Sequence, residues 1–185
     1  MKTLLIGAAL PLSILATPAA ADVPAITLGG SAAQTCYVSA AERRHDEMSI
    51  QECTSALDDK SLTMFDRAGT LVNRGILYLF AGNSMSAVRD FDDAIALDPQ
   101  QAEAWLDKAV AFVNTGNSAA ALDLADHALK LRTHKPALAY YVRGLAYEQQ
   151  GQLRDAYGSL QTARRLDPNW SEPKLELSRY RIVGQ

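Results

Sequence analysis

Histidines and clustered carboxylates are the side chains of this 185-residue chain that could bind a metal or move protons. The closest approach to a ligand set is Asp123, Asp126 and His127, on adjacent turns of an expected helix. Charged residues at this spacing are typical of a solvated helix face. His45 and His134 stand apart, in a charged run and in a loop. Because no serine, cysteine or lysine stands in a catalytic motif either, we expect neither an enzyme nor a bound metal or cofactor.

The cysteines offer a different chemistry. Cys36 and Cys53 have sixteen residues between them, a spacing that suits two antiparallel helices joined by a loop. Without Cys-x-x-Cys spacing they do not resemble a redox pair, and two cysteines alone do not complete a metal site. A disulfide and a pair of buried free thiols are the remaining alternatives, and the choice between them depends on the compartment.

A basic start and an apolar run open the chain and indicate that compartment. Met1-Lys2 precedes the apolar stretch from Leu4 to Leu15, and Ala19-Ala20-Ala21 supplies the small residues that a signal peptidase reads. A retained anchor would need roughly 20 apolar residues to span a bilayer. We therefore predict a signal peptide over residues 1–21, cleaved after Ala21, and a periplasmic or secreted protein without a stable membrane span.

Export favours the disulfide, because two cysteines in a small secreted chain are usually bridged. In the chain-entropy model a loop of this size contributes roughly 3 kcal/mol to stability. The mature chain would have 185 minus 21, or 164, residues, which fits one compact unit. Loss of Lys2 changes the formal charge from −3 to −4, so the composition does not suggest a nucleic-acid binder.

The sequence from residue 68 onwards contains a pattern of residue types that repeats about every 34 residues and predicts a series of similar helix pairs. Small residues recur at Gly75, Ala109 and Gly144, and again at Ala87, Ala121 and Ala156, where they allow two helices to approach closely. Three positions after each of Gly75, Ala109 and Gly144 stands an aromatic residue. Four positions after that aromatic residue stands a glycine, which can end a helix. The three copies read Leu71, Gly75, Tyr78, Gly82, Ala87, Phe91, Ala94, Leu97 and Pro99; then Trp105, Ala109, Phe112, Gly116, Ala121, Ala125, Ala128, Leu131 and Thr133; then Tyr140, Gly144, Tyr147, Gly151, Ala156, Leu160, Ala163, Leu166 and Pro168.

From residue 68 to the C-terminus the chain resembles the tetratricopeptide repeat family, with departures at Ala125, where an aromatic residue is usual, and Thr133, where proline is usual. The resemblance implies an all-α fold, an α-solenoid of antiparallel helix pairs with about three such units. One pair cannot bury its apolar face alone, so the copies must stack. We expect a capping helix over Ser171 to Ile182, with Ser171 as N-cap and Trp170 packed on Leu175.

The segment before the repeats, residues 22–67, is predicted to contain a degenerate helix pair from about Gly30 to Leu57. Residues 53–57 are similar to residues 91–95 of the first copy, so Cys53 takes the position of a large second-helix residue. Cys36 then falls where a facing first helix would run, and a disulfide would staple this weak core. Residues 68–185 form the repeat domain.

In this family the first helix of each pair lines a concave surface, and the resemblance implies an apolar groove for a helix or an extended peptide. Its predicted lining is Val72, Asn73, Ile76, Leu79, Phe80, Leu106, Val110, Val113, Asn114, Tyr141, Leu145, Glu148 and Gln149, with Tyr141 as an anchor. A clamp for a partner's C-terminal carboxylate is not supported, because of the corresponding positions only Asn73 matches in kind.

Two functions therefore remain open at the level of the sequence. The first is a protein-interaction scaffold of the periplasm or cell envelope that binds a protein or peptide partner in the groove. The alternative is a self-associating structural protein whose groove is buried between copies. The groove could also be covered by the chain's own N-terminal segment, since a patch this apolar seldom stays bare. Length, charge and repeat pattern do not separate these hypotheses.

Overall fold

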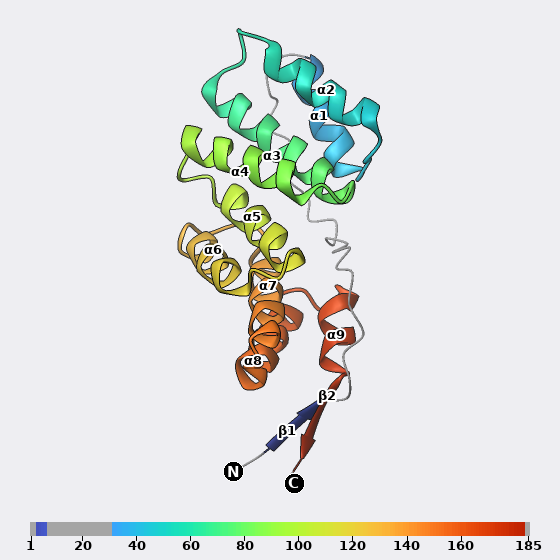
Figure 1. Cartoon of the computed structure of the whole chain (residues 1–185), viewed down its shortest axis with the longest axis vertical. Helices are drawn as coiled ribbons and strands as arrows, with labels where there is room; N and C mark the ends of the chain where they lie inside the picture. Colours follow the sequence, from blue (N-terminus) through green and yellow to red (C-terminus); the bar gives the residue numbers. More distant parts are fainter. Residues whose placement is uncertain (1–2, 7–30, 184–185) are drawn as a thin grey trace.

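Nine helices and a two-stranded ribbon make up the computed structural model, which describes residues 3–6 and 31–183 (Figure 1). The helices are α1 (Ser31–Ala41), α2 (Glu47–Asp58), α3 (Met64–Phe80), α4 (Ser84–Leu97), α5 (Ala102–Asn114), α6 (Ser118–Lys130), α7 (Pro136–Gln149), α8 (Leu153–Leu166) and α9 (Ser171–Leu177). Strands β1 (Thr3–Ile6) and β2 (Tyr180–Val183) pair antiparallel, with Thr3 opposite Val183. The predicted all-α solenoid is confirmed, with this ribbon as its one addition among the described residues.

Consecutive helices pack as antiparallel pairs, α1 with α2, α3 with α4, α5 with α6 and α7 with α8, and the pairs follow one another along the long axis of the molecule (Figure 1). The buried side chains form three clusters along this axis. One lies among α1, α2 and α3, one joins α3 and α4 to α5, and the largest extends from α5 to Tyr180. The core is therefore a chain of local contacts, as expected of a repeat protein.

Close helix approach explains the repeated small residues. A Cβ atom built at Gly75 would stand 2.5 Å from Cε1 of Phe91, and one at Gly144 would stand 2.7 Å from Cγ of Leu160. The predicted helix ends are equally clear, because Gly82, Gly116 and Gly151 all adopt positive φ, between 73° and 78°. Glycine enters this left-handed region without a Cβ penalty.

Thr133, the departure from the usual proline, has a specific partner. Its buried hydroxyl donates to Oε1 of Glu103 at 3.1 Å, and the His134 N–H donates to the same oxygen at 2.9 Å. In the same loop, between α6 and α7, Arg132 adopts a left-handed backbone conformation with a φ of 61°. A side chain of α5 thus holds the loop that a proline would otherwise stiffen.

The C-terminal helix is shorter than predicted. It ends at Leu177 instead of Ile182, because residues 180–183 form β2. Its N-cap residue is Trp170, without a side-chain cap bond, while Ser171 lies inside the helix. Leu175 is 63% exposed, and Trp170 packs on Tyr141 of α7 instead, because this ring offers the larger apolar surface.

The predicted signal peptide, residues 1–21, lies outside the described residues apart from β1, and so does the segment 22–30. The expected N-terminal helix pair corresponds to α1 and α2, within the predicted segment 22–67. Cys36 and Cys53 are joined as a disulfide, with a Cα–Cα distance of 4.7 Å and both residues fully buried.

Candidate peptide-binding groove

The first helices of the pairs, α3, α5 and α7, lie next to one another and carry the predicted lining in matching register. Val72, Leu106 and Tyr141 occupy one level, and Ile76, Val110 and Leu145 the next. The lining residues of α3, α5 and α7 differ in how much of their surface is exposed to solvent. A ligand can contact only the exposed ones.

Five of the predicted lining residues are core residues in this structure. They are Val72 at 6% exposure, Leu106 at 0%, Val113 at 2%, Tyr141 at 2% and Leu145 at 6%. The ring of Tyr141 lies 4.7 Å, centroid to centroid, from the ring of Trp170, which leads into α9. Burial raises the pKa of the Tyr141 hydroxyl well above its usual value. Tyr141 therefore holds the capping segment and is not an open anchor.

The same capping segment covers Glu148. Arg179 forms an ion pair with Glu148, and the Tyr180 hydroxyl donates to Oε2 of Glu148 at 3.1 Å. Arg179 also pairs with the buried Glu176 at 2.7 Å. Gln149, although exposed, donates from Nε2 to the carbonyl oxygen of Val113 at 2.9 Å. The chain's own C-terminal residues thus occupy the α7 part of the predicted groove.

The rest of the lining stays at least partly accessible on α3 and α5. We call this surface the open strip; it consists of Asn73, Ile76, Leu79, Phe80, Val110 and Asn114. Phe80 is partly exposed and belongs to none of the three core clusters. Within the described residues, the amides of Asn73 and Asn114 make no side-chain hydrogen bond. The open strip therefore offers apolar side chains flanked by two amides.

A buried carboxylate lies beside the open strip and was not selected as a site residue from the sequence. Asp107 of α5 is 6% exposed, and its Oδ2 atom accepts no hydrogen bond within the described residues. The nearest cation is Nζ of Lys135, 3.9 Å away at the start of α7. Burial raises the pKa of Asp107, a shift opposed by Lys135 and reinforced by the charge of Glu103. Residues three or four positions apart share one face of a helix, so the spacing between Val110 and Asp107 could have placed Asp107 on the groove face.

A second feature missed from the sequence is a row of cations. One residue before each of the small first-helix residues stands Arg74, Lys108 or Arg143. Each lies over the aromatic residue one turn later, 5.9 Å from the ring centroid of Tyr78, 5.4 Å from that of Phe112 and 5.8 Å from that of Tyr147. The spacing alone could have found them, since cation and aromatic residue recur with the repeat.

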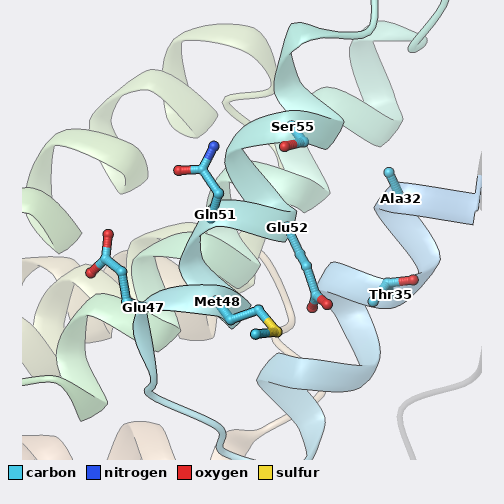
Figure 2. A pocket seen from close by; sticks show the side chains of 7 residues that line it. All are labelled: Ala32, Thr35, Glu47, Met48, Gln51, Glu52 and Ser55. Carbon is cyan, nitrogen blue, oxygen red and sulfur yellow. The ribbon is translucent and has the colours of Figure 1, made fainter.

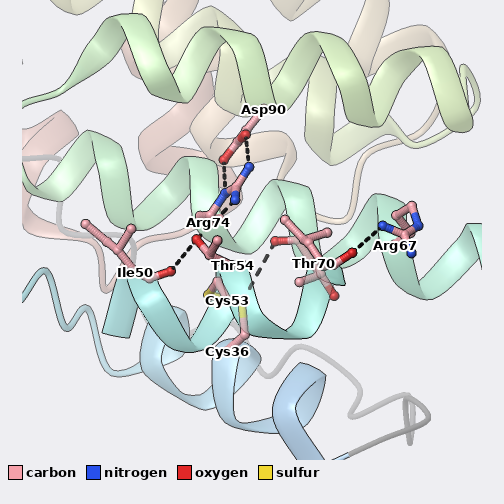
Figure 3. Close-up of polar contacts among 9 residues, drawn as sticks. Cys36, Ile50, Cys53, Thr54, Arg67, Thr70, Arg74 and Asp90 are labelled. Atoms are coloured by element: carbon pink, nitrogen blue, oxygen red, sulfur yellow. Dashed lines mark hydrogen bonds and ion pairs between the residues drawn. A yellow bond between two sulfur atoms is a disulfide. The ribbon is translucent and has the colours of Figure 1, made fainter. Parts of the chain in front are cut away.

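These cations form ion pairs with acids of the second helices. They pair with Asp90, Asp92 and Asp126 respectively. The contact of Arg74 is bidentate, with hydrogen bonds of 2.8 and 2.7 Å to Asp90, and this bonding raises the pKa of Arg74 (Figure 3). A third bond, to Oγ1 of Thr54 at 3.1 Å, ties α2 to α3. The row joins neighbouring helices and leaves no free cation for a ligand at these positions.

Two hollows lie outside the groove. The larger, about 610 Å³, opens between α1 and α2 and is lined by Met48 and Glu52 of α2 and by Thr35 of α1 (Figure 2). The carboxylate of Glu52 already accepts from the Ser39 hydroxyl at 3.2 Å. The second hollow, about 440 Å³, lies beside Arg67 and Arg74, whose guanidinium groups are already bonded. Neither presents a set of side chains arranged for chemistry.

Within residues 3–6 and 31–183 no helix has the length and apolar character needed to cross a membrane. In the same part of the chain, no three histidine, cysteine, aspartate or glutamate side chains gather as metal ligands.

Stacked helix pairs with an accessible first-helix surface define a helical-repeat protein of the kind that serves as an interaction scaffold. Models of the tetratricopeptide repeat match residues 72–136 and 137–170, together more than half of the chain. The chain belongs to the tetratricopeptide repeat family, and the family supports a role in protein–protein interaction. Members are generally scaffolds and not enzymes.

Solved structures show the same fold. MamA from Desulfovibrio magneticus RS-1 is 23% identical, with a TM-score of 0.64 over 80% of this chain and 82% of the other. The tetratricopeptide domain of Arabidopsis OM64 is 21% identical, with a TM-score of 0.59 over 63% and 96%. The first such domain of Spaghetti (RPAP3), solved with the HSP90 peptide SRMEEVD, is 24% identical, with a TM-score of 0.56 over 60% and 89%.

Proposed function

We propose that this protein is a non-enzymatic interaction scaffold that binds a peptide segment of a partner protein along the open strip of α3 and α5. The observation that supports this proposal most directly is the partly exposed apolar row of Ile76, Leu79, Phe80 and Val110. Such a row on helices held rigid by their neighbours suits a ligand that inserts apolar anchors. The amides of Asn73 and Asn114 can bond the backbone of an extended segment.

The ligand differs in kind from the one solved with Spaghetti. A clamp for a C-terminal carboxylate needs basic and amide side chains, whereas the corresponding positions here hold Val72, Ile76, Asp107, Leu138 and Val142, with only Asn73 similar. A buried carboxylate at one of these positions would repel a terminal carboxylate. An internal apolar segment fits the open strip better.

We further propose that the protein works in the periplasm or outside the cell, after cleavage following Ala21. The basic start, the apolar run and the alanines before position 22 support this proposal, as does the buried Cys36–Cys53 disulfide, which suits an oxidising compartment. N-terminal sequencing of the protein recovered from a periplasmic fraction should begin at Asp22. Recovery of an intact N-terminus from the cytoplasm would contradict the proposal.

Whether the open strip binds peptides can be tested with a displayed random library, from which peptides are selected for binding to the purified protein. Leu79→Glu and Val110→Glu each place a charge in the open strip and should weaken the selected peptides at least tenfold, because an apolar anchor would meet a carboxylate. Met85→Glu is the matched control, since Met85 is 69% exposed at the start of α4 and outside the strip. Isothermal titration with each variant measures the effect.

Equal affinity for all three variants would show that the open strip is not the binding surface. Sedimentation of the same variants addresses self-association, the alternative function. If the wild type forms oligomers that Leu79→Glu and Val110→Glu dissociate while Met85→Glu does not, the strip is occupied by a second copy, and the scaffold proposal is wrong.

A further inference from the structure

Within the described residues, Asp107 is a buried carboxylate that has only a long ion pair, with Lys135. Its side chain is 8% exposed and Oδ2 accepts no hydrogen bond within the described residues, while Nζ of Lys135, at 3.9 Å, is beyond hydrogen-bond distance. A buried carboxylate oxygen without a hydrogen bond costs free energy, and native proteins retain few of them. The neighbouring acid of α5, Glu103, does have a structural task, because it holds Thr133 and His134.

The position of Asp107 connects it to the groove. It stands one turn before Val110 of the open strip, and 34 residues after Asn73, its equivalent on the adjacent helix α3. The amide of Asn73 is unpaired within the described residues. One turn before Asn73, a Cβ atom added to Gly69 would meet nothing within 4 Å, so there is open space at this end of the strip.

We propose that Asp107, assisted by Asn73, binds the cationic side chain of a lysine or arginine in the partner peptide, next to the apolar residues that occupy the strip. This inference rests on the proposed function and adds a charge requirement to it. Lys135, whose side chain is 22% exposed at the start of α7, moves aside, and the ligand's cation replaces it at Oδ2. A charge-assisted hydrogen bond to the buried carboxylate then supplies the hydrogen bond that Oδ2 lacks in this structure.

The selected peptides test the inference directly. Peptides selected on the wild-type protein should carry a lysine or arginine at a fixed distance from their apolar residues, and selection on Asp107→Asn should lose that residue while keeping the apolar ones. Replacing the basic residue of a synthetic peptide by norleucine should weaken binding to the wild type about tenfold, the magnitude of one charge-assisted bond. The same replacement should leave binding to Asp107→Asn unchanged.

Two further variants separate recognition from a structural effect. Lys135→Met removes the competing cation and should strengthen binding of the basic peptide but not of the norleucine peptide. Asp123→Asn removes an equal charge from the exposed surface of α6 and should change neither affinity. Circular dichroism of each variant confirms that the fold is retained.

The results of these experiments distinguish a failure of the role of Asp107 from a failure of the scaffold function. Peptides that bind, depend on Val110 and show no preference for a basic residue would overturn the role of Asp107 and leave the scaffold function standing. Equal norleucine effects on the wild type and Asp107→Asn would overturn it as well. Failure to select any peptide sensitive to Val110→Glu would refute the scaffold proposal, and the inference with it.

Discussion

Gly75 and Gly69 lie six residues apart on α3 and have opposite surroundings. A Cβ atom at Gly75 would overlap the ring of Phe91 at 2.5 Å, whereas one at Gly69 would meet nothing within 4 Å. We expect Gly75→Ala to lower the free energy of unfolding by about 1–3 kcal/mol through overpacking. Gly69→Ala should raise it by about 0.5–1 kcal/mol, because alanine loses less backbone entropy in a helix. Urea unfolding of both variants measures the contrast, and equal effects would show that helix packing does not determine the choice of glycine.

The pKa of Asp107 leads to a pH-dependent prediction. Burial raises it above the unfolded value of 3.8, so the folded protein binds the proton more tightly than the unfolded chain. The contribution of this group to stability is therefore greatest below that unfolded value and is lost as the pH rises through the folded pKa. The amide in Asp107→Asn does not titrate, so this variant does not lose stability in this way as the pH rises.

We therefore expect the unfolding free energy of Asp107→Asn to exceed that of the wild type near pH 7 and to approach it towards pH 4. Urea titrations at several pH values measure the difference, with Asp123→Asn as the exposed control. A difference that grows towards acid would mean that Asp107 is stabilised in its charged form by Lys135.

The N-terminal helix pair depends on a covalent link more than the other pairs do. Within the described residues its core cluster contains five buried apolar residues, Cys36, Ala40, Ile50, Cys53 and Leu77, the last of which belongs to α3. Cys36→Ala combined with Cys53→Ala should lower the unfolding free energy by about 3 kcal/mol, the value expected for a loop of this size. Chemical denaturation with and without a reducing agent measures this, since the agent should weaken the wild type and leave the double variant unchanged. An equal response of both proteins would contradict the prediction.

Over the whole molecule, each repeat of a solenoid contacts only the adjacent repeats, so a destabilising substitution should affect its own repeat and the neighbouring ones. Trp170 is 4% exposed and packs on Tyr141, so Trp170→Ala should cost about 3 kcal/mol in the C-terminal part. Hydrogen exchange should accelerate in α7, α8 and α9 and remain unchanged in α1 and α2. Leu166→Ala, at a residue that is 46% exposed, is the control. Acceleration along the entire chain would show that the molecule unfolds as one cooperative unit.

Much of the fold could be predicted from the sequence, because the repeat encodes contacts between residues close in the chain. Gly82 ends a helix and Gly75 admits Phe91 through local geometry that any copy of the pattern reproduces. The exact end of α9 and the Trp170–Tyr141 contact were not predictable in this way. They depend on which surface the last residues meet, and the repeat pattern does not specify it.

The candidate site was predictable only as a list of positions. By register, Tyr141 and Ile76 are equally good lining residues, but their exposure depends on what covers each helix. The C-terminal residues Trp170, Arg179 and Tyr180 cover α7, while α3 and α5 keep accessible side chains. The missing hydrogen bond at Oδ2 of Asp107 likewise depends on the distance between α5 and the start of α7.

The helix pairs, their order, their small-residue contacts and the family were all predictable from the amino-acid sequence, because they follow from periodic residue types acting over one repeat length. Contacts in the folded molecule determine which predicted lining residues stay exposed, how Glu103 holds Thr133 and why Oδ2 of Asp107 accepts no hydrogen bond. These features arise between segments separated by about one repeat or more, where packing selects one arrangement among several that the local pattern allows equally well.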